Sequence, residues 1–428
     1  MPDSLAAKGY SAYTSTMYIR EFSVKNYLIH KNTKIALSPI TVFVGPNGGG
    51  KSAFFDAILN FSMVARGNVK QAFGPFPYSF AATKYHGASA LARITFDVTM
   101  TRSAGSKGSL QYQVDYSQKK ATLDPGATPD FEIFHEKLVR FPDNKVLFDR
   151  ADIDASPLSN AIKYVQEDRG IFAALRAASL AKEPEEEYLP LSDAAREISR
   201  FNRFRLNSYD LASASRLPDL TEEGNAPRLS HTGEDLGACL YYMHEKKDPA
   251  LATIYKHIEE VVPGFKEFEF TFWGSDRLVF SMVFNDARGT VPGVRLSDGV
   301  RLFIGLMVLI YSPNRPSVML IEEPENGLTP TALKTFYRAA RQLAFPENPA
   351  NASQILISSH SPFIICEAWN GEDREFIHQF KSEKGQAVVR PFSAAVKEQH
   401  IVLAKAGDGK RTHLGLTNAE DLMSGYLS

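Results

Sequence analysis

The feature that most constrains this chain is the glycine-rich segment GPNGGGKS, residues 45–52. It fits the pattern G-x-x-x-x-G-K-[ST], follows the apolar run ITVFV (40–44), and precedes a helical pattern of apolar residues. Strand, glycine loop and helix in this order make a phosphate-binding loop, because backbone N–H groups and the helix N-terminus face one anion. A strand buried on both faces is typical of a parallel sheet. The segment predicts an α/β fold with a phosphate site. The alternative is a glycine-rich turn without a ligand.

Each position of this loop has an expected role. Lys51 would reach the β- and γ-phosphates, and the Ser52 hydroxyl would bind Mg²⁺. The residues expected to bind the nucleotide here are Gly45, Pro46, Asn47, Gly48, Gly49, Gly50, Lys51 and Ser52.

A second motif, VMLIEEPENG (318–327), places two carboxylates at the end of an apolar strand. A carboxylate at the end of a buried strand, beside a phosphate loop, is where a Mg²⁺ ligand belongs. We therefore expect Glu322 on the metal side and Glu323 as the general base that activates water. The alternative is an acidic turn at the surface.

Two weaker motifs complete the set. LSDGV (296–300) precedes an apolar helix, and Ser297 and Gly299 at a helix start can form an anion site. SSHS (358–361) follows the apolar run QILI, and His360 could hydrogen-bond a γ-phosphate or the attacking water. Alone, the first is explained as an N-cap serine and the second as a structural histidine.

The order GPNGGGKS, LSDGV, EEPENG, SSHS resembles the ATP-binding-cassette (ABC) ATPases. It is most similar to the non-transporter branch that includes SMC, RecF and OLD-type proteins, and to the predicted prokaryotic AAA-family ATPases of phage-defence systems such as Septu and PARIS. The likeness covers about residues 17–66 and 265–390. It implies an ABC-ATPase head, a P-loop NTPase with a mixed sheet and an antiparallel β-lobe, with ATP and Mg²⁺ as cofactors.

The resemblance also implies an ATP sandwich of two protomers. Ser297 and Gly299 would then contact the γ-phosphate held by the other protomer. Glu323 would be the catalytic base, His360 the switch histidine, and Asn326 and Gly327 part of the D-loop. The sequence departs from the family at Glu322, where relatives usually carry Asp, and at Thr329, where they often carry His. No Q-loop glutamine is evident, and Gln71 is the nearest candidate; Lys25 and Asn26 are further candidate contacts to the nucleotide.

Composition limits the remaining possibilities. The 48 Lys and Arg against 49 Asp and Glu exclude a protein that is basic throughout, although a local basic patch is compatible with this balance. Cys239 and Cys366 are too few for a disulfide framework or a zinc cluster. The longest apolar run, 302–311, is about half the length of a membrane span. No signal peptide is evident, so we expect a cytoplasmic protein that does not contact a membrane.

We expect four segments along the chain. They are a flexible tail (1–16), an N-terminal part of the ATPase domain with the phosphate loop and β-lobe (17–158), a helical insertion (159–260) and a C-terminal part of the ATPase domain (261–428). Within the insertion, Arg196, Arg200 and Arg203 are predicted to share a helix face, either as a contact for nucleic acid or as an ordinary solvated face. Lys334, Arg338 and Arg341 form a similar stripe.

The function predicted is an ABC-type ATPase that dimerises, or forms a higher homo-oligomer, on ATP and controls a separate nuclease or toxin effector in prokaryotic defence. DNA is a possible ligand. The main alternative is a RecF-like DNA-repair ATPase that binds DNA itself. Two further alternatives are a transporter subunit, which the large insertion disfavours, and a nucleotide-gated scaffold that does not hydrolyse ATP.

Overall fold

The computed structural model describes residues 17–73, 80–89, 91–102, 108–118, 131–182, 186–221, 226–371, 373–398, 404–405 and 412–413. The tail expected at residues 1–16 lies outside this part of the chain.

The central sheet has six strands in the order β16-β15-β3-β14-β13-β8. Five of them run parallel, and only β16 is antiparallel to its neighbour. Their bounds are β3 Ile40–Val44, β8 Asn202–Phe204, β13 Val318–Glu322, β14 Gln354–Ser359, β15 Ile377–Glu383 and β16 Gln386–Pro391. The parallel strand predicted at 40–44 and the mixed α/β class are confirmed. Because parallel neighbours end at the same edge, the segments after β3, β13 and β14 meet there.

Both faces of this sheet are buried, which explains the continuous apolar runs. In β3, Phe43 packs into one hydrophobic cluster, whereas Val42 and Val44 pack into the other. The first cluster includes α1 (Lys51–Arg66). The second includes three helices: α10 (Asp298–Tyr311), α11 (Pro330–Ala344) and α12 (Pro362–Asn370). Successive strand residues point to opposite faces, so each run must be apolar at every position.

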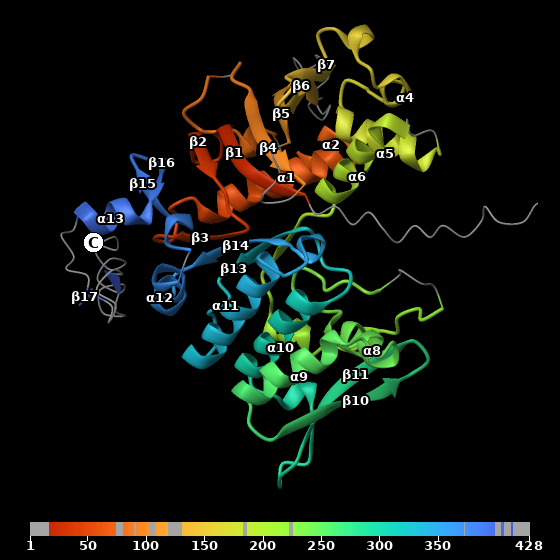
Figure 1. Cartoon of the computed structure of the whole chain (residues 1–428), viewed down its shortest axis with the longest axis vertical. Helices are drawn as coiled ribbons and strands as arrows, with labels where there is room; N and C mark the ends of the chain where they lie inside the picture. Colours follow the sequence, from red (N-terminus) through yellow and green to blue (C-terminus); the bar gives the residue numbers. More distant parts are fainter. Residues whose placement is uncertain are drawn as a thin grey trace, which may run out of the picture.

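A second, antiparallel sheet forms the predicted β-lobe, in the order β2-β1-β4-β5-β6-β7. Its strands are β1 Tyr18–Tyr27, β2 His30–Ala36, β4 Ile94–Thr101, β5 Ser109–Gln118, β6 Phe131–Phe141 and β7 Lys145–Asp149. The sequence at 18–24, 90–100, 110–116 and 131–139 alternates between apolar and polar residues, as is typical of strands, and these ranges overlap β1, β4, β5 and β6. Helices α5 (Ile171–Leu180) and α6 (Leu189–Ile198) lie beside this sheet at one end of the molecule (Figure 1).

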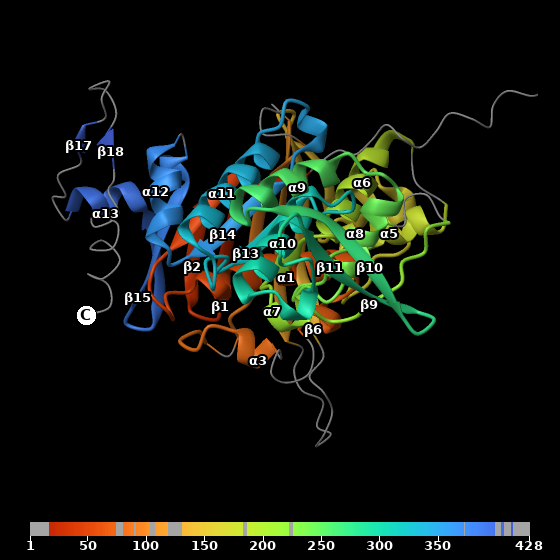
Figure 2. The same cartoon turned by 90° about the horizontal axis from the view of Figure 1, so that it is seen from below.

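A third sheet lies at the opposite end, as Figure 1 shows. It pairs β10 (Phe265–Trp273), β11 (Arg277–Phe284) and β12 (Thr290–Pro292) with the short β9 (Ser215–Arg216). Helices α8 (Leu236–Glu245) and α9 (Ala250–Val261) cover it, and β15, α12 and α13 (Phe392–Glu398) lie on the other side of the molecule (Figure 2). The remaining short elements are α2 Val69–Ala72, α3 Phe80–Thr83, α4 Ser159–Ile162, α7 Ser208–Leu211, β17 Ala404–Lys405 and β18 Thr412–His413.

The prediction that residues 159–260 are helical is wrong at one place that matters. Helix α6 ends at Ile198, and residues 202–204 form β8, which pairs in parallel with Met319–Ile321 of β13. Phe201, just before the strand, is buried in the first hydrophobic cluster, and Phe204, its last residue, is buried in the second. Arg203 therefore lies on the central sheet, and it does not share a helix face with Arg196 and Arg200.

The longest apolar run, over most of its length, and the two cysteines are buried within the described residues. The apolar run 302–311 lies in α10, which is buried from Phe303 to Ile310. Among the helices that the structure describes, none combines the length and the hydropathy needed to cross a bilayer. Cys239 and Cys366 are both buried free thiols.

Candidate functional site

The loop between β3 and α1 has a backbone that only glycine readily adopts. Gly45 has φ 140° and Gly50 has φ 106°. A Cβ atom on Gly45 would lie 2.1 Å from the carbonyl oxygen of Phe380, so no larger residue fits there. The loop leads directly into α1, a helix of 16 residues, whose first N–H groups have no partner within the helix. The arrangement is that of an anion site.

Lys51 lies over this loop. Its ammonium group donates to the carbonyl oxygens of Gly45 (2.7 Å) and Pro46 (3.0 Å), and the residue is only 6% exposed. Burial lowers the pKa of Lys51 to about 8, against the opposing effect of Glu323, Glu325 and Glu322. A phosphate would supply the negative charge that this buried cation lacks. Ser52 is exposed at the start of the same helix.

Glu322 ends β13 with a buried carboxylate. One of its oxygens, Oε2, accepts a hydrogen bond from the Arg203 guanidinium at 2.7 Å. The other, Oε1, is buried without a hydrogen-bond partner among the described residues. An unpaired buried carboxylate oxygen is costly and fits a missing cation. Mg²⁺ is commonly held by one or two protein groups plus phosphates and water, so Ser52 and Glu322 suit it.

Glu323 has a left-handed backbone, with φ 44°. Such a conformation is strained for a residue other than glycine and is often found at functional sites. The Glu323 amide donates to the Ser358 carbonyl of β14 at 2.9 Å, which anchors the turn. Its side chain is 28% exposed and lies 3.2 Å from Asn326 Nδ2 and 3.7 Å from His360 Nε2. The strained turn thus places the carboxylate beside the histidine.

His360 follows β14 and faces the same site. Burial and the nearby Lys51 lower its pKa, while Glu323 opposes the shift. Its backbone N–H donates to a Glu325 carboxylate oxygen at 2.5 Å, and burial raises the pKa of Glu325. The imidazole is therefore neutral near pH 7, and its position is tied to the segment after β13.

The structure leaves the LSDGV segment at the surface. Ser297 is the N-cap residue of α10, is exposed, and makes no capping hydrogen bond with its side chain. Gly299 packs on the D-loop-like segment, because a Cβ there would lie 2.3 Å from the Gly327 carbonyl oxygen. Lys51, Glu322, Glu323 and His360 lie together, whereas Ser297 is available to another molecule.

The two basic stripes are largely used within the chain. Arg196 is exposed and contacts Asp193, and Arg200 contacts Glu197 and Asn314. In the second stripe, Lys334 and Arg341 contact Glu367 and Asp373 of the same chain. These contacts favour a structural role for both stripes.

The remaining residues that the sequence singled out are Gln71, Thr329, Lys25 and Asn26. Gln71 lies on α2, and its backbone N–H donates to Asn68 Oδ1, 3.0 Å away. Thr329 caps α11 by accepting from Ala332 N, which accounts for a threonine there. Lys25 is exposed, and Asn26 Nδ2 donates to the Arg93 carbonyl.

Two residues that shape the site were not assigned to it from the sequence. His30 is fully buried; its Nε2 donates to the Gly50 carbonyl (3.0 Å) and its Nδ1 accepts from Thr33 (2.9 Å). Burial lowers the pKa of His30 to about 4, so it stays neutral. Arg203 is the second. His30 lies 15 residues before the loop, and Arg203 lies in a segment with helical periodicity, so neither residue carries a local signal of its role.

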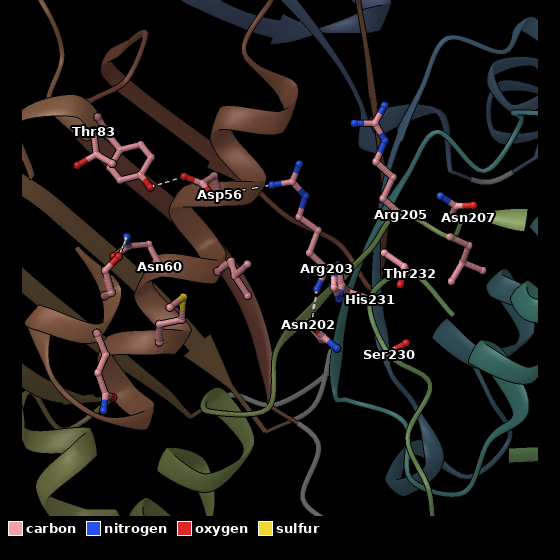
Figure 3. A pocket seen from close by; sticks show the side chains of 16 residues that line it. Asp56, Asn60, Thr83, Asn202, Arg203, Arg205, Asn207, Ser230, His231 and Thr232 are labelled. Atoms are coloured by element: carbon pink, nitrogen blue, oxygen red, sulfur yellow. Dashed lines mark hydrogen bonds and ion pairs between the residues drawn. The ribbon is translucent and has the colours of Figure 1, made fainter. Parts of the chain in front are cut away.

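A cavity of about 1130 Å³ opens beside Arg203 (Figure 3). One wall is the face of α1 that carries Asp56 and Asn60, and the other is the segment from Asn202 to Asn207. Figure 3 shows Arg203 reaching toward Asp56, whose other oxygen accepts from the Tyr27 hydroxyl at 2.6 Å. Gln71 also lines this cavity.

Comparison with known proteins gives one family. Residues 40–366 match the family model described as “AAA domain, putative AbiEii toxin, Type IV TA system”. This range contains the loop at 45–52, Ser297, Gly299, Glu322, Glu323 and His360, whereas Lys25 and Asn26 lie before it. No curated protein matches.

Three solved structures of SMC head domains are similar at low identity. One is an SmcHead bound to the C-winged helix domain of ScpA (13% identity, TM-score 0.48, covering 88% of this chain and 99% of that one). Another is the SMC head domain from Thermotoga maritima (13%, 0.41, 87% and 98%). The third is an Smc head domain bound to the C-terminal domain of ScpA derived from Pyrococcus furiosus (12%, 0.45, 90% and 99%).

Proposed function

The chain belongs to the family of AAA-domain ATPases described by that model, and from this premise we propose that it binds ATP·Mg²⁺ at residues 45–52 and hydrolyses it with Glu323. We further propose that two copies sandwich the nucleotide and that the dimer controls a separate effector protein. The observation that carries the proposal is the meeting of Lys51, Glu322, Glu323 and His360 at the carboxyl edge of one parallel sheet.

The roles follow from the contacts. Lys51 and the N–H groups at the start of α1 bind the phosphates. Ser52 and Glu322 would hold Mg²⁺, which when bound neutralises phosphate charge. Glu323 accepts the proton of the attacking water, and the neutral His360 beside it orients that water or the γ-phosphate. Asn326 holds the Glu323 carboxylate from the other side.

The dimer gives a role to Ser297, which is exposed at the start of α10 and makes no capping hydrogen bond with its side chain. An exposed helix start is suited to an anion that another protomer presents. Because Gly299 packs against Gly327, docking at this surface would be transmitted to the segment that follows Glu323. Slow turnover that depends on a partner is the behaviour we propose for such a switch.

The setting we propose is prokaryotic defence. The support is the family description, which names a toxin of a toxin–antitoxin system. Direct DNA binding, as in a RecF-like repair ATPase, is the weaker proposal, because the three arginines that could contact nucleic acid, Arg196, Arg200 and Arg203, all contact polar side chains of the same chain.

Glu323→Gln tests the proposal. Removing the general base should lower ATP turnover by at least about 100-fold while fluorescent ATP still binds. The variant should also form an ATP-dependent dimer in size-exclusion chromatography with light scattering. Glu347→Gln, at an exposed glutamate, is the matched control. Normal turnover in Glu323→Gln would assign the base to another residue, and failure of the unmodified protein to bind ATP would refute the function.

A further inference from the structure

Arg203 contacts the carboxylate of Glu322 directly. Its guanidinium donates to Glu322 Oε2 at 2.7 Å and lies 3.8 Å from Asp56 Oδ1. Asp56 is in turn held by the Tyr27 hydroxyl at 2.6 Å. The Glu322 side chain is 3% exposed and that of Arg203 28%, so the ion pair is largely shielded from water. A chain of contacts thus runs from β1 through α1 to the end of β13.

The two oxygens of Glu322 are treated differently. Oε2 is occupied by Arg203, whereas Oε1 is buried and has no partner among the described residues. A competitor for the metal would be expected to engage the metal-binding oxygen. Here the arginine engages one oxygen and leaves the other free, which is how a group outside the coordination sphere orients a ligand.

The length of the Glu322 side chain explains why a contact that orients its carboxylate is needed. Glutamate has one more rotatable bond than aspartate, so an unsupported glutamate samples more orientations. The parallel pairing of β8 with β13 sets Arg203 opposite Leu320, two residues before Glu322. From there the guanidinium reaches forward along the strand to the carboxylate.

We propose that Arg203 is a positioning residue that fixes the Glu322 carboxylate with Oε1 directed to Mg²⁺, and that Asp56 and Tyr27 hold Arg203 in place. The proposal rests on the proposed function in one respect, the assignment of Glu322 to the metal. It extends that function by adding a residue from a different strand.

The test is the Mg²⁺ requirement of nucleotide binding, measured with a fluorescent ATP analogue titrated with MgCl₂. Arg203→Ala should raise the Mg²⁺ concentration for half-maximal binding about 10- to 100-fold, the usual effect of losing such a partner. Nucleotide binding in EDTA should stay within about twofold of the unmodified protein. Arg203→Lys keeps the positive charge but can make only a single contact. Its Mg²⁺ concentration for half-maximal binding should lie between those of the unmodified protein and Arg203→Ala. Arg196→Ala, an exposed arginine of the same segment, should change nothing.

Glu322→Asp supplies the second measurement. The shorter carboxylate can no longer reach both Arg203 and the metal, so it should raise the Mg²⁺ requirement as Arg203→Ala does. The double variant should be little worse than either single one, because both remove the same interaction. Asp56→Asn should give a smaller shift in the same direction, and it keeps the proposal testable if Arg203→Ala unfolds.

Three results would overturn the inference. An unchanged Mg²⁺ requirement in Arg203→Ala would leave the arginine a purely structural role. A lower requirement would mean that Arg203 competes with the metal. If instead the unmodified protein binds nucleotide without any response to Mg²⁺, the assignment of Glu322 to the metal fails, and the inference fails with it. Failure of the unmodified protein to bind nucleotide at all would refute the proposed function.

Discussion

Lys51→Met should make the nucleotide-free protein more stable while it abolishes ATP binding. The Lys51 ammonium group is buried and its pKa falls from the usual 10.5 to about 8. Each tenfold change in proton affinity is worth about 1.4 kcal/mol, so holding the charged form in the fold costs about 3 kcal/mol near neutral pH. Methionine keeps the apolar stem and removes the charge. Loss of the two hydrogen bonds to Gly45 and Pro46 offsets part of the gain, about 1–2 kcal/mol.

Urea unfolding of both proteins at several pH values measures this difference. Between pH 8 and 10.5 the unfolded state binds more protons at Lys51 than the folded state, so the unmodified protein gains stability as pH rises. The stability advantage of Lys51→Met over the unmodified protein should therefore be largest below pH 8 and should shrink as pH approaches 10.5. The reasoning is refuted if the variant is less stable at pH 7, or if the difference between the two proteins does not change with pH.

Two further substitutions test the composite site and the loop. Ser297→Arg should block the ATP-dependent dimer and ATP turnover, while the monomer still binds nucleotide. Ser179→Arg, at an exposed serine of α5, is the control. ATP turnover in Ser297→Arg would contradict the dimer model. Gly45→Ala should weaken nucleotide binding more than tenfold, because its Cβ would meet the Phe380 carbonyl at 2.1 Å. Gly385→Ala shares a positive φ but meets nothing within 4 Å, so equal affinity of these two variants would contradict the steric argument.

The parts of the site that the sequence predicted are those built from contiguous residues. The loop at 45–52 and the Glu322–Glu323 pair each follow directly from an apolar strand, so the strand and its functional residues appear as one pattern. Parallel strands end at a common edge, which is enough to predict that these segments meet. The strand assignments at 40–44, 318–322 and 354–357 agree with the structure for this reason.

Arg203 was predicted in a helix, but it lies in a strand, because its segment pairs with residues that are far away in the chain. The segment SDAAREISRFNRFRL carries helical periodicity throughout, although only its first part is helical. Residues 202–204 become a strand by pairing with β13, more than 110 residues later. A three-residue strand has no periodicity of its own to reveal it. The contact with Glu322 therefore depends on tertiary structure alone.

The phosphate loop also depends on residues distant in sequence. Gly45 and Gly49 lie against the Phe380 backbone of β15, and Gly50 lies against Ala387 of β16 and accepts a hydrogen bond from His30. The β15–β16 hairpin joins the central sheet through β3 and reaches the β-lobe through the bond from Ala387 N to the Ile29 carbonyl. A glycine-rich loop without such support would sample many conformations and bind phosphate weakly. Phe380 and Ala387 therefore help to fix the shape of a glycine-rich loop that lies more than 300 residues before them.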